Sequence, residues 1–351
     1  MDPENIFPSF DIDVEGIITA IAENGYRKVL LQGPEGLKRG LPLLAEIIEK
    51  GTGARVLIDA EPCFGACDHA GERALAAGAD ALIHLGHSDI PSMDRNMPVP
   101  VHFFHAEMKV KWDMLHAGLK KIVETVSSKR IALFTTVQHI SLLDQAKRFL
   151  EDHSATVLIG EPGGREAFPG QVLGCSFSAA EGLELENASL LFMGTGRFHP
   201  MGLSTSTGKE VHTLDPVTGA VGKITTMERE RFLRKRFGSI QKARDLLDGG
   251  CMTGILIGSK PGQRRVELAS DMADLLDVKG YDYRMIVMDS VAPMKLFTLG
   301  LDLVINTACP RIALDDSVSY VRQGIVMITP VELRMALDEL PWSEYRFDEE
   351  W

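Results

Sequence analysis

The sequence predicts an α/β fold built from three related small α/β domains with mainly parallel sheets. Short apolar runs alternate with amphipathic stretches along the chain, which is typical of parallel strands joined by right-handed helical crossovers. The order strand–helix–strand–turn–helix–strand recurs roughly every hundred residues. Each repeat carries one cysteine in a turn beside a strand-like run. The predicted domains are residues 1–105 with Cys67, residues 106–222 with Cys175, and residues 223–351 with a basic linker helix and Cys309.

The individual elements follow from apolar runs and helical periodicity. Predicted strands are residues 28–32, 54–59, 81–86 and 99–104, then 130–135, 155–160 and 189–194, then 254–258, 283–288, 302–306 and 324–328. Predicted helices include residues 71–77, 141–152, 227–248 and 265–276. Residues 203–226 are rich in Ser, Thr and Gly, and are predicted to form an extended excursion. The basic helix at residues 227–248 is expected to present a solvated, ion-paired face; the alternatives are that it faces the acidic remainder of the protein or the surface of a partner protein.

The composition narrows the class of protein. The chain has 351 residues, 45% hydrophobic and 25% charged, with a formal net charge of −12. This suits a globular protein with an ample core and makes nucleic-acid binding an unfavoured function. No apolar run approaches the roughly 20 residues that span a bilayer, and the acidic amino terminus has no signal-peptide pattern. We therefore expect a cytoplasmic protein with reduced thiols, whose five cysteines serve metal binding, catalysis or packing.

Three cysteines have the same kind of local sequence. Cys67, Cys175 and Cys309 each have glycine, alanine or proline as neighbours and each follow a predicted parallel strand at its carboxyl end, where open α/β sheets bind their ligands. One thiolate per domain gives three ligands, which suits a four-iron, four-sulfur cluster with one iron open to substrate. The alternatives are plain packing, or a zinc site in which His69 supplies a fourth ligand.

The other two cysteines and a group of four histidines are not expected to bind a metal. Cys63 and Cys67 have the spacing that opens a radical S-adenosylmethionine (SAM) motif, but position 70 is Ala where that motif needs a third cysteine. Cys63 is therefore interpreted as a bystander, with a ligand or redox neighbour as the alternative, and Cys251 as a core residue. Four histidines near strand ends of the first domain are not expected to form a metal site, because no three share a turn. They are His84, His87, His102 and His105.

Five stretches, taken in order, match a known family. They are Gln32-Gly33-Pro34-Glu35-Gly36-Leu37-Lys38, Cys63-Phe64-Gly65-Ala66-Cys67-Asp68, Leu173-Gly174-Cys175, Gly194-Thr195-Gly196-Arg197-Phe198-His199-Pro200 and Ala308-Cys309-Pro310-Arg311. In these stretches the chain resembles the archaeal diphthamide biosynthesis enzymes, the 2-(3-amino-3-carboxypropyl)histidine synthases, a noncanonical radical SAM family. Cys63 is an addition to the single cysteine usual in the second stretch, and Cys67, followed by Asp68, fits the family pattern better.

The resemblance implies an architecture, a cofactor and a reaction. It implies a homodimer of three-domain subunits with pseudo-threefold symmetry around one [4Fe-4S] cluster, held by Cys67, Cys175 and Cys309. The reduced cluster would cleave the sulfur–γ-carbon bond of SAM. The resulting 3-amino-3-carboxypropyl radical would add to C2 of a histidine imidazole on translation elongation factor 2. Methylthioadenosine would leave, and a reductase would supply electrons.

Two loops are candidates for SAM. The Gln32–Lys38 loop leaves a strand and precedes a helix, whose N–H groups and dipole favour an anion such as the SAM carboxylate; an ordinary tight turn is the alternative. Its candidate residues are Gln32, Gly33, Pro34, Glu35, Gly36 and Lys38. The equivalent loop of the third domain offers Gly258, Ser259, Lys260, Gly262 and Gln263. Neither loop has the Walker spacing.

Three further residues are candidates for chemistry. Arg197 and His199 follow a strand of the second domain and would bind SAM, orient the target histidine or move a proton. A structural histidine is the alternative for His199. Arg311, beside Cys309, would offset cluster charge or bind a substrate carboxylate, or else form an ion pair between domains.

Two other functions fit the three-cysteine pattern. The first is an iron–sulfur dehydratase or condensing enzyme of the quinolinate-synthase kind, whose open iron acts as a Lewis acid without SAM or reductant. The second is a non-catalytic partner subunit, which retention of all three cysteines disfavours. Turnover by this chain alone with reductant, SAM and elongation factor distinguishes the three.

Overall fold

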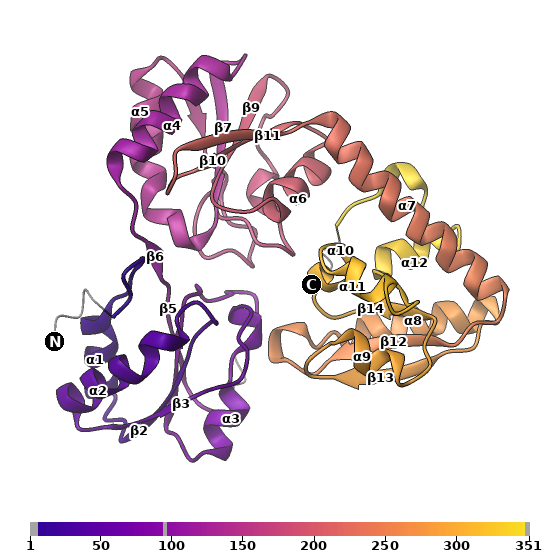
Figure 1. The fold of residues 1–351 in the computed structure, drawn as a ribbon, viewed down its shortest axis with the longest axis horizontal. Helices are drawn as coiled ribbons and strands as arrows, with labels where there is room; N and C mark the ends of the chain where they lie inside the picture. Colours follow the sequence, from indigo (N-terminus) through magenta and orange to yellow (C-terminus); the bar gives the residue numbers. More distant parts are fainter. Residues whose placement is uncertain (1–5, 94–96, 348–351) are drawn as a thin grey trace. The chain divides into compact units, whose positions relative to one another are not determined.

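The computed structural model describes residues 6–93 and 97–347 (Figure 1). The chain divides into two compact units. Unit 1 comprises Met1–Leu173, Ser178–Thr195 and His212–Lys223, and unit 2 comprises Gly174–Phe177, Gly196–Val211 and Ile224–Trp351. The Cys67 loop therefore belongs to unit 1, whereas the loops of Cys175 and Cys309 belong to unit 2.

The first sheet of unit 1 is parallel and has the strand order β3-β2-β4-β5. Its strands are β2 (Lys28–Gln32), β3 (Arg55–Ile58), β4 (Ala81–Leu85) and β5 (Val101–Phe104). Successive residues of β2 point to opposite faces, as a pleated strand requires. Val29 and Leu31 pack with helices α1 (Val14–Glu23) and α2 (Leu41–Thr52), while Leu30 packs with α3 (Gly71–Ala76) on the other face.

The second sheet of unit 1 has the order β11-β10-β9-β7-β8. Its strands are β7 (Arg130–Thr135), β8 (Thr156–Leu158), β9 (Ala188–Met193), β10 (Val211–Asp215) and β11 (Ala220–Ile224). β7 lies parallel to both β8 and β9. Helices α4 (Trp112–Thr125) and α5 (Leu143–Asp152) cover one face, with Leu119, Leu133 and Leu150 in the shared core. β1 (Phe10–Asp11) and β6 (Glu107–Met108) form a short antiparallel pair. β6 is part of the segment that joins the two sheets.

Unit 2 is built on a third parallel sheet with the order β13-β12-β14-β15. Its strands are β12 (Thr253–Gly258), β13 (Arg284–Met288), β14 (Leu303–Asn306) and β15 (Val326–Ile328). Ile255 and Ile257 pack with the helices of one face, and Leu256 packs with those of the other. The first face carries α7 (Thr226–Asp248), α8 (Val266–Lys279) and α12 (Pro330–Ala336). The second face carries α9 (Pro293–Phe297), α10 (Pro310–Leu314) and α11 (Ser317–Val321). Helix α6 (Phe198–Thr207) also belongs to unit 2.

The repeated topology confirms the predicted α/β fold with mainly parallel sheets. In each sheet the second strand lies beside the first, and the third lies on the first strand's other side. This order places a topological switch point between the first and third strands, where α/β proteins bind ligands. The three domain boundaries and the pseudo-threefold arrangement stay predictions.

One prediction about the middle of the chain is wrong. Residues 203–226 do not form an extended excursion, because they contain the second half of α6 and the strands β10 and β11. Asp215 accepts hydrogen bonds from the backbone of Val217 and Thr218, and Gly219 has a φ of 68°, so a tight turn joins these strands. Buried Val211, Leu214 and Ile224 hold the strands in place.

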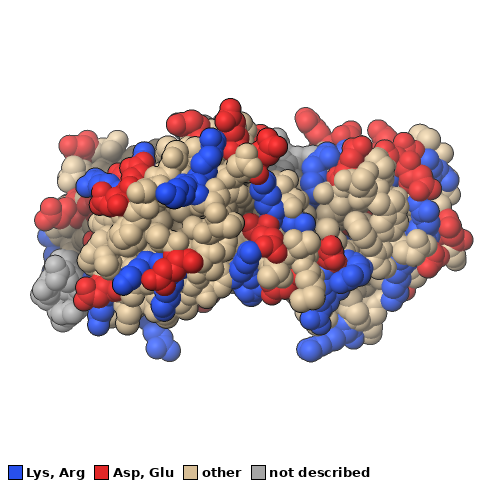
Figure 2. Space-filling view, turned by 90° about the horizontal axis from the view of Figure 1, so that it is seen from above, with Lys and Arg blue, Asp and Glu red and all other residues tan. Residues whose placement is uncertain are grey.

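The basic helix α7 has the predicted solvated face, on which Arg231, Arg234 and Lys235 are exposed. A capping box formed by Thr225 and Glu228 starts it, but Arg236 in its middle is only 2% exposed. Acidic and basic side chains are interspersed on the face drawn in Figure 2. Within the described ranges, no helix has the length and apolar character needed to cross a membrane.

Candidate functional site

The three predicted cluster cysteines lie where their sequence context placed them. Cys67 is in a 3₁₀ turn, Ala66–Asp68, that follows β3. Cys175 follows β8 in the sequence, and Cys309 caps the amino end of α10 directly after β14. All three side chains are half-buried, whereas Cys63 is buried. A half-buried thiol at the end of a strand remains accessible to a metal centre.

The Cys67 loop is fastened to β2 through Gln32. The Gln32 amide nitrogen donates to the Asp68 carbonyl over 2.9 Å, and its oxygen accepts from the Ala70 N–H over 3.0 Å. Gln32 is fully buried. Its side chain was predicted to belong to an anion-binding loop, but it holds the cysteine loop against the end of the first strand.

The Cys175 loop and the start of α10 both contact Phe198. A Cβ added to Gly174 would lie 2.8 Å from the Phe198 ring, so only glycine allows this approach. On the other side, the Arg311 guanidinium lies 5.2 Å from the centre of the same ring, a cation–π distance. Within unit 2, Phe198 thus lies between the loop of Cys175 and the helix that Cys309 caps.

The Cys309 loop is held by residues that the sequence did not reveal. Arg265, at the start of α8, donates to the carbonyl oxygens of Thr307 and Ala308 over 2.6 and 2.7 Å. The Asn306 amide donates to the Cys309 carbonyl over 2.8 Å, and its oxygen accepts from the Ala308 N–H. Their only sequence signal is position: Arg265 begins the helix after the first strand, and Asn306 ends the third strand.

His199 lies in the same region of unit 2. Burial lowers the pKa of its imidazole to about 4, and the Arg311 guanidinium acts in the same direction. The ring is therefore neutral near pH 7 and has a lone pair for a proton. Arg197 pairs with Glu228 over 2.7 Å, and Arg311 pairs with Asp315 over 2.9 Å on its own helix.

Comparison with known proteins identifies the family. The family model for diphthamide synthesis proteins matches residues 33–346. This chain belongs to the diphthamide synthesis protein family. The 2-(3-amino-3-carboxypropyl)histidine synthase of Pyrococcus horikoshii is 37% identical over 97% of this chain and 93% of that protein, and the enzyme of the same name from Methanocaldococcus jannaschii is 29% identical over the same shares. The crystal structure of Dph2 from Pyrococcus horikoshii with a 4Fe-4S cluster matches with a TM-score of 0.84 and 36% identity, covering 97% of this chain and 94% of that one. The predicted family membership is confirmed.

The two predicted SAM loops of this diphthamide synthesis protein differ in their surroundings. Lys38 donates to the carbonyl oxygens of Ala60 and Glu61 over 2.6 Å and pairs with Glu35 over 2.7 Å. A 3₁₀ turn at Lys38–Gly40 lies between this loop and α2. The α-helix therefore begins at Leu41, three residues after the loop ends at Lys38. The dipole of α2 therefore acts from farther away than the sequence suggested.

The second loop packs against the Cys309 loop. A Cβ on Gly258 would lie 3.0 Å from that of Ala308, which places the two backbones in close contact. The Ser259 hydroxyl donates to the Asp289 carboxylate over 3.3 Å, and Lys260 and Gln263 are buried. Residues 258–263 thus border the loop that carries the third predicted cluster ligand.

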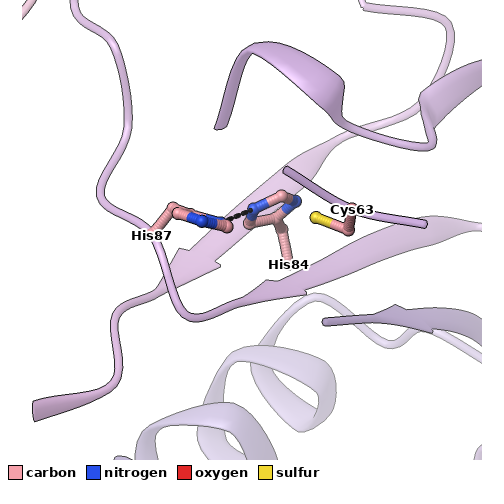
Figure 3. Close-up of side chains that lie close together, drawn as sticks. All are labelled: Cys63, His84 and His87. Atoms are coloured by element: carbon pink, nitrogen blue, oxygen red, sulfur yellow. Dashed lines mark hydrogen bonds between the residues drawn. The ribbon is translucent and has the colours of Figure 1, made fainter. Parts of the chain in front are cut away.

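A group of ligand-type side chains that the sequence did not predict lies in unit 1. Possible ligand atoms of Cys63, His84 and His87 all lie within 4.8 Å of one another (Figure 3). The prediction that the four histidines form no metal site is based on the spacing of the histidines alone, without a cysteine ligand. His102 instead contacts Tyr26 over 3.1 Å, and His105 contacts Glu107 over 3.1 Å. The third member of the group comes from the cysteine loop, which is brought close only by the pairing of β3, β2 and β4.

Proposed function

We propose that this chain transfers the 3-amino-3-carboxypropyl group of SAM to C2 of a histidine imidazole on translation elongation factor 2, the first step of diphthamide biosynthesis. The observation that carries the proposal is the 37% identity to a 2-(3-amino-3-carboxypropyl)histidine synthase over 97% of the chain. The second support is the set of three cysteines, each half-buried in a loop beyond the carboxyl end of a parallel strand. Together they favour a transferase over a protein that only docks a partner.

The residues that would hold a [4Fe-4S] cluster are Cys67, Cys175 and Cys309. Thiolates are the ligands that such clusters require, and three of them leave one iron open. The donor set fits: each thiol lies in a loop held by other residues, with small residues beside it at Gly65 and Gly174. When bound and reduced, the cluster supplies the electron that cleaves the sulfonium carbon–sulfur bond of SAM.

His199 is the proposed proton acceptor of the reaction. Once the aminocarboxypropyl group has joined C2 of the target imidazole, that carbon must lose its proton, and an electron must leave as well. A pKa lowered to about 4 by burial leaves the His199 ring unprotonated at neutral pH, so the ring would accept the proton as a weak base. Arg197, held by Glu228, lies two residues away and would orient the substrate.

SAM is proposed to bind at one of the two candidate loops, Gln32–Lys38 or 258–263. The candidate atoms are backbone N–H groups of the glycine-rich turns and the charged end of Lys260, which suit a carboxylate. The Lys38 ammonium would have to give up one of its contacts with Ala60, Glu61 and Glu35 to take part. Arg311 adds a guanidinium for the same group or for cluster charge. Within the first loop, Gln32 acts on the Cys67 loop, since its amide is engaged there.

The proposed partners are elongation factor 2, a second copy of this chain and an electron-donating reductase, in the cytoplasm. Support for a second copy comes from the edge strand β13 and the following helix, where large apolar side chains are exposed: Met285, Val287, Met294 and Phe297. An exposed apolar edge strand commonly pairs with another chain. Light scattering of the purified protein measures the oligomer.

The test is turnover by this chain alone under anaerobic conditions. With dithionite, SAM and elongation factor 2, we expect a modified histidine peptide by mass spectrometry and release of methylthioadenosine. The reconstituted protein should hold about four irons, and Cys67→Ala, Cys175→Ala and Cys309→Ala should each lose iron and activity. Cys251→Ala is the matched control and should keep both, because its sulfur contacts the Thr253 hydroxyl at the amino-terminal end of β12, opposite to the end that leads into residues 258–263.

Other outcomes would favour the rival functions. Consumption of a small carbonyl substrate without SAM or reductant would indicate a Lewis-acid dehydratase of the quinolinate-synthase kind. Iron binding without turnover, rescued by a second protein, would indicate a partner subunit. Retention of a stable cluster in Cys175→Ala would contradict the three-ligand assignment.

A further inference from the structure

The group formed by Cys63, His84 and His87 lies at the switch point of the first sheet. His84 is at the end of β4, His87 follows in the next turn, and Cys63 belongs to the loop after β3. β4 and β3 lie on opposite sides of β2, so their carboxyl ends border the crevice where this class of sheet binds ligands. Cys63 is 3% exposed and His84 is fully buried.

Hydrogen bonds fix which nitrogen of His84 has the lone pair. The Gln32 amide nitrogen donates to the Asp68 carbonyl, so its oxygen must be the atom that faces His84 Nδ1 at 2.8 Å. An amide oxygen only accepts, and His84 Nδ1 therefore carries the proton. The neutral ring then has its lone pair on Nε2, the atom that lies 3.0 Å from His87 Nδ1.

This arrangement is the one that metal-binding histidines use. A ligating imidazole typically donates its other N–H to a fixed acceptor, which sets the tautomer and the ring orientation. Gln32 is such an acceptor, and it is itself fixed by two backbone hydrogen bonds. Because His84 Nε2 lies at hydrogen-bond distance from His87 Nδ1, at most one of these two nitrogens carries a proton.

We propose that Cys63, His84 and His87 form a second metal site, for a borderline-soft divalent cation such as Zn²⁺, distinct from the three cluster cysteines. One thiolate and two imidazoles are a zinc ligand set, and three protein ligands leave one position for water. Two imidazole nitrogens on a tetrahedral zinc lie about 3.3 Å apart, close to the 3.0 Å between His84 Nε2 and His87 Nδ1. The two nitrogens thus already have nearly the spacing of bound ligands, and binding requires the rings to turn so that both lone pairs point at the ion.

Metal binding changes the protons of the group in a defined way. The Cys63 thiol loses its proton to solvent, since a coordinating sulfur is deprotonated outright. The proton on His87 Nδ1, which is donated to His84, moves to Nε2 of the same ring. The bound ion, one thiolate and two neutral rings carry a net charge of +1. The buried carboxylate of Asp68, which accepts from the Phe64 N–H in the same loop, offsets that charge.

Zinc binding by the iron-loaded protein tests the proposal. The protein is reconstituted anaerobically, checked for about four irons, equilibrated with micromolar free Zn²⁺ and desalted. We expect one zinc per chain, and zinc K-edge absorption should show one sulfur at about 2.3 Å and two nitrogens at about 2.0–2.1 Å. Absorption at the zinc edge reports only the ligands of zinc, so the sulfur ligands of the iron cluster do not contribute to the signal.

Two variants and one control locate the site. Cys63→Ser and His87→Gln should each weaken zinc binding at least about tenfold and keep their iron. His102→Gln, on the neighbouring strand β5, should keep both metals. The proposal is wrong if iron-loaded protein holds less than a tenth of a zinc per chain, or if both variants retain zinc. It is equally wrong if the zinc shell holds only sulfur, or if Cys63→Ser loses iron, since Cys63 would then be a cluster ligand.

Discussion

Arg265 donates to the carbonyl oxygen of Ala308 over 2.7 Å, and to that of Thr307 over 2.6 Å. These are the two residues before Cys309, so one guanidinium from α8 fixes the turn that presents the third proposed cluster ligand. Hydrogen bonds from a charged donor contribute about 1.5–3 kcal/mol each. The contact therefore links the start of α8, the helix that follows β12, to the loop at the end of β14.

Removing this guanidinium should loosen the cluster without abolishing the fold. We expect Arg265→Ala to release iron to a chelator about tenfold faster than the parent, which corresponds to about 1.4 kcal/mol. Iron release under anaerobic conditions is the measurement. Arg264→Ala is the matched control, because Arg264 is exposed and donates a long hydrogen bond of 3.4 Å to the Ser259 carbonyl. Equal release rates for the two variants would contradict the positioning role.

Gly174 should be intolerant of even one added carbon. A Cβ there would lie 2.8 Å from Phe198, so Gly174→Ala must shift the ring or the Cys175 loop. Overpacking of this kind costs about 1–3 kcal/mol, and we expect lower iron content after reconstitution. The double variant Gly174→Ala/Phe198→Leu should recover iron, since the smaller side chain leaves room. If the double variant binds no more iron than Gly174→Ala, the clash is not the cause.

The sequence predicted the sheets well because each strand is a local apolar run. Lys28–Gln32, Arg130–Thr135 and Thr253–Gly258 are buried on both faces, and the cysteines lie in turns that follow such runs. Local patterns of this kind need no knowledge of distant partners. The family-level stretches added the expected function, and the comparisons confirmed the family.

What the sequence missed depends on strand register. Gln32, His84 and the Asp68 carbonyl meet only because β2 pairs with β4 in a register that sets Gln32 opposite His84. No spacing in the sequence links Cys63 with His87, which are carried by the loops after different strands. The same holds for Arg265, whose partners lie some forty residues further along. These contacts are products of packing, and local pattern contains no trace of them.

The buried ion pair of unit 2 should be costly to break. Arg236 on α7 donates to Glu332 on α12 over 2.7 and 2.6 Å, and both side chains are almost fully buried. Removing one member of such a pair leaves an uncompensated charge and costs about 3–5 kcal/mol. We expect Arg236→Met to lower the denaturant midpoint of unfolding strongly. Lys279→Met removes an exposed pair with Glu339 and should cost less than about 1 kcal/mol. Similar midpoints for the two variants would contradict the difference in burial.

His139 should make the protein less stable in mild acid. Its side chain is 2% exposed. It packs close to Gly194, because a Cβ added to that glycine would lie 3.7 Å from the His139 ring. Burial lowers the pKa of His139 from 6.5 to about 4, although Asp215 acts in the opposite direction. Between these two values the unfolded chain binds a proton that the folded chain does not, so stability falls as the pH drops through this range.

The share of His139 in this loss can be isolated by substitution. At pH 5 it amounts to about 2 kcal/mol relative to pH 7. We therefore expect the melting temperature of His139→Gln to fall less between pH 7 and pH 5 than that of the parent, even if its value at pH 7 is lower. Ser141→Ala, an exposed and non-titrating neighbour, should keep the parent's pH dependence. A His139→Gln variant whose melting temperature falls as steeply as the parent's would show that another buried group carries the acid sensitivity.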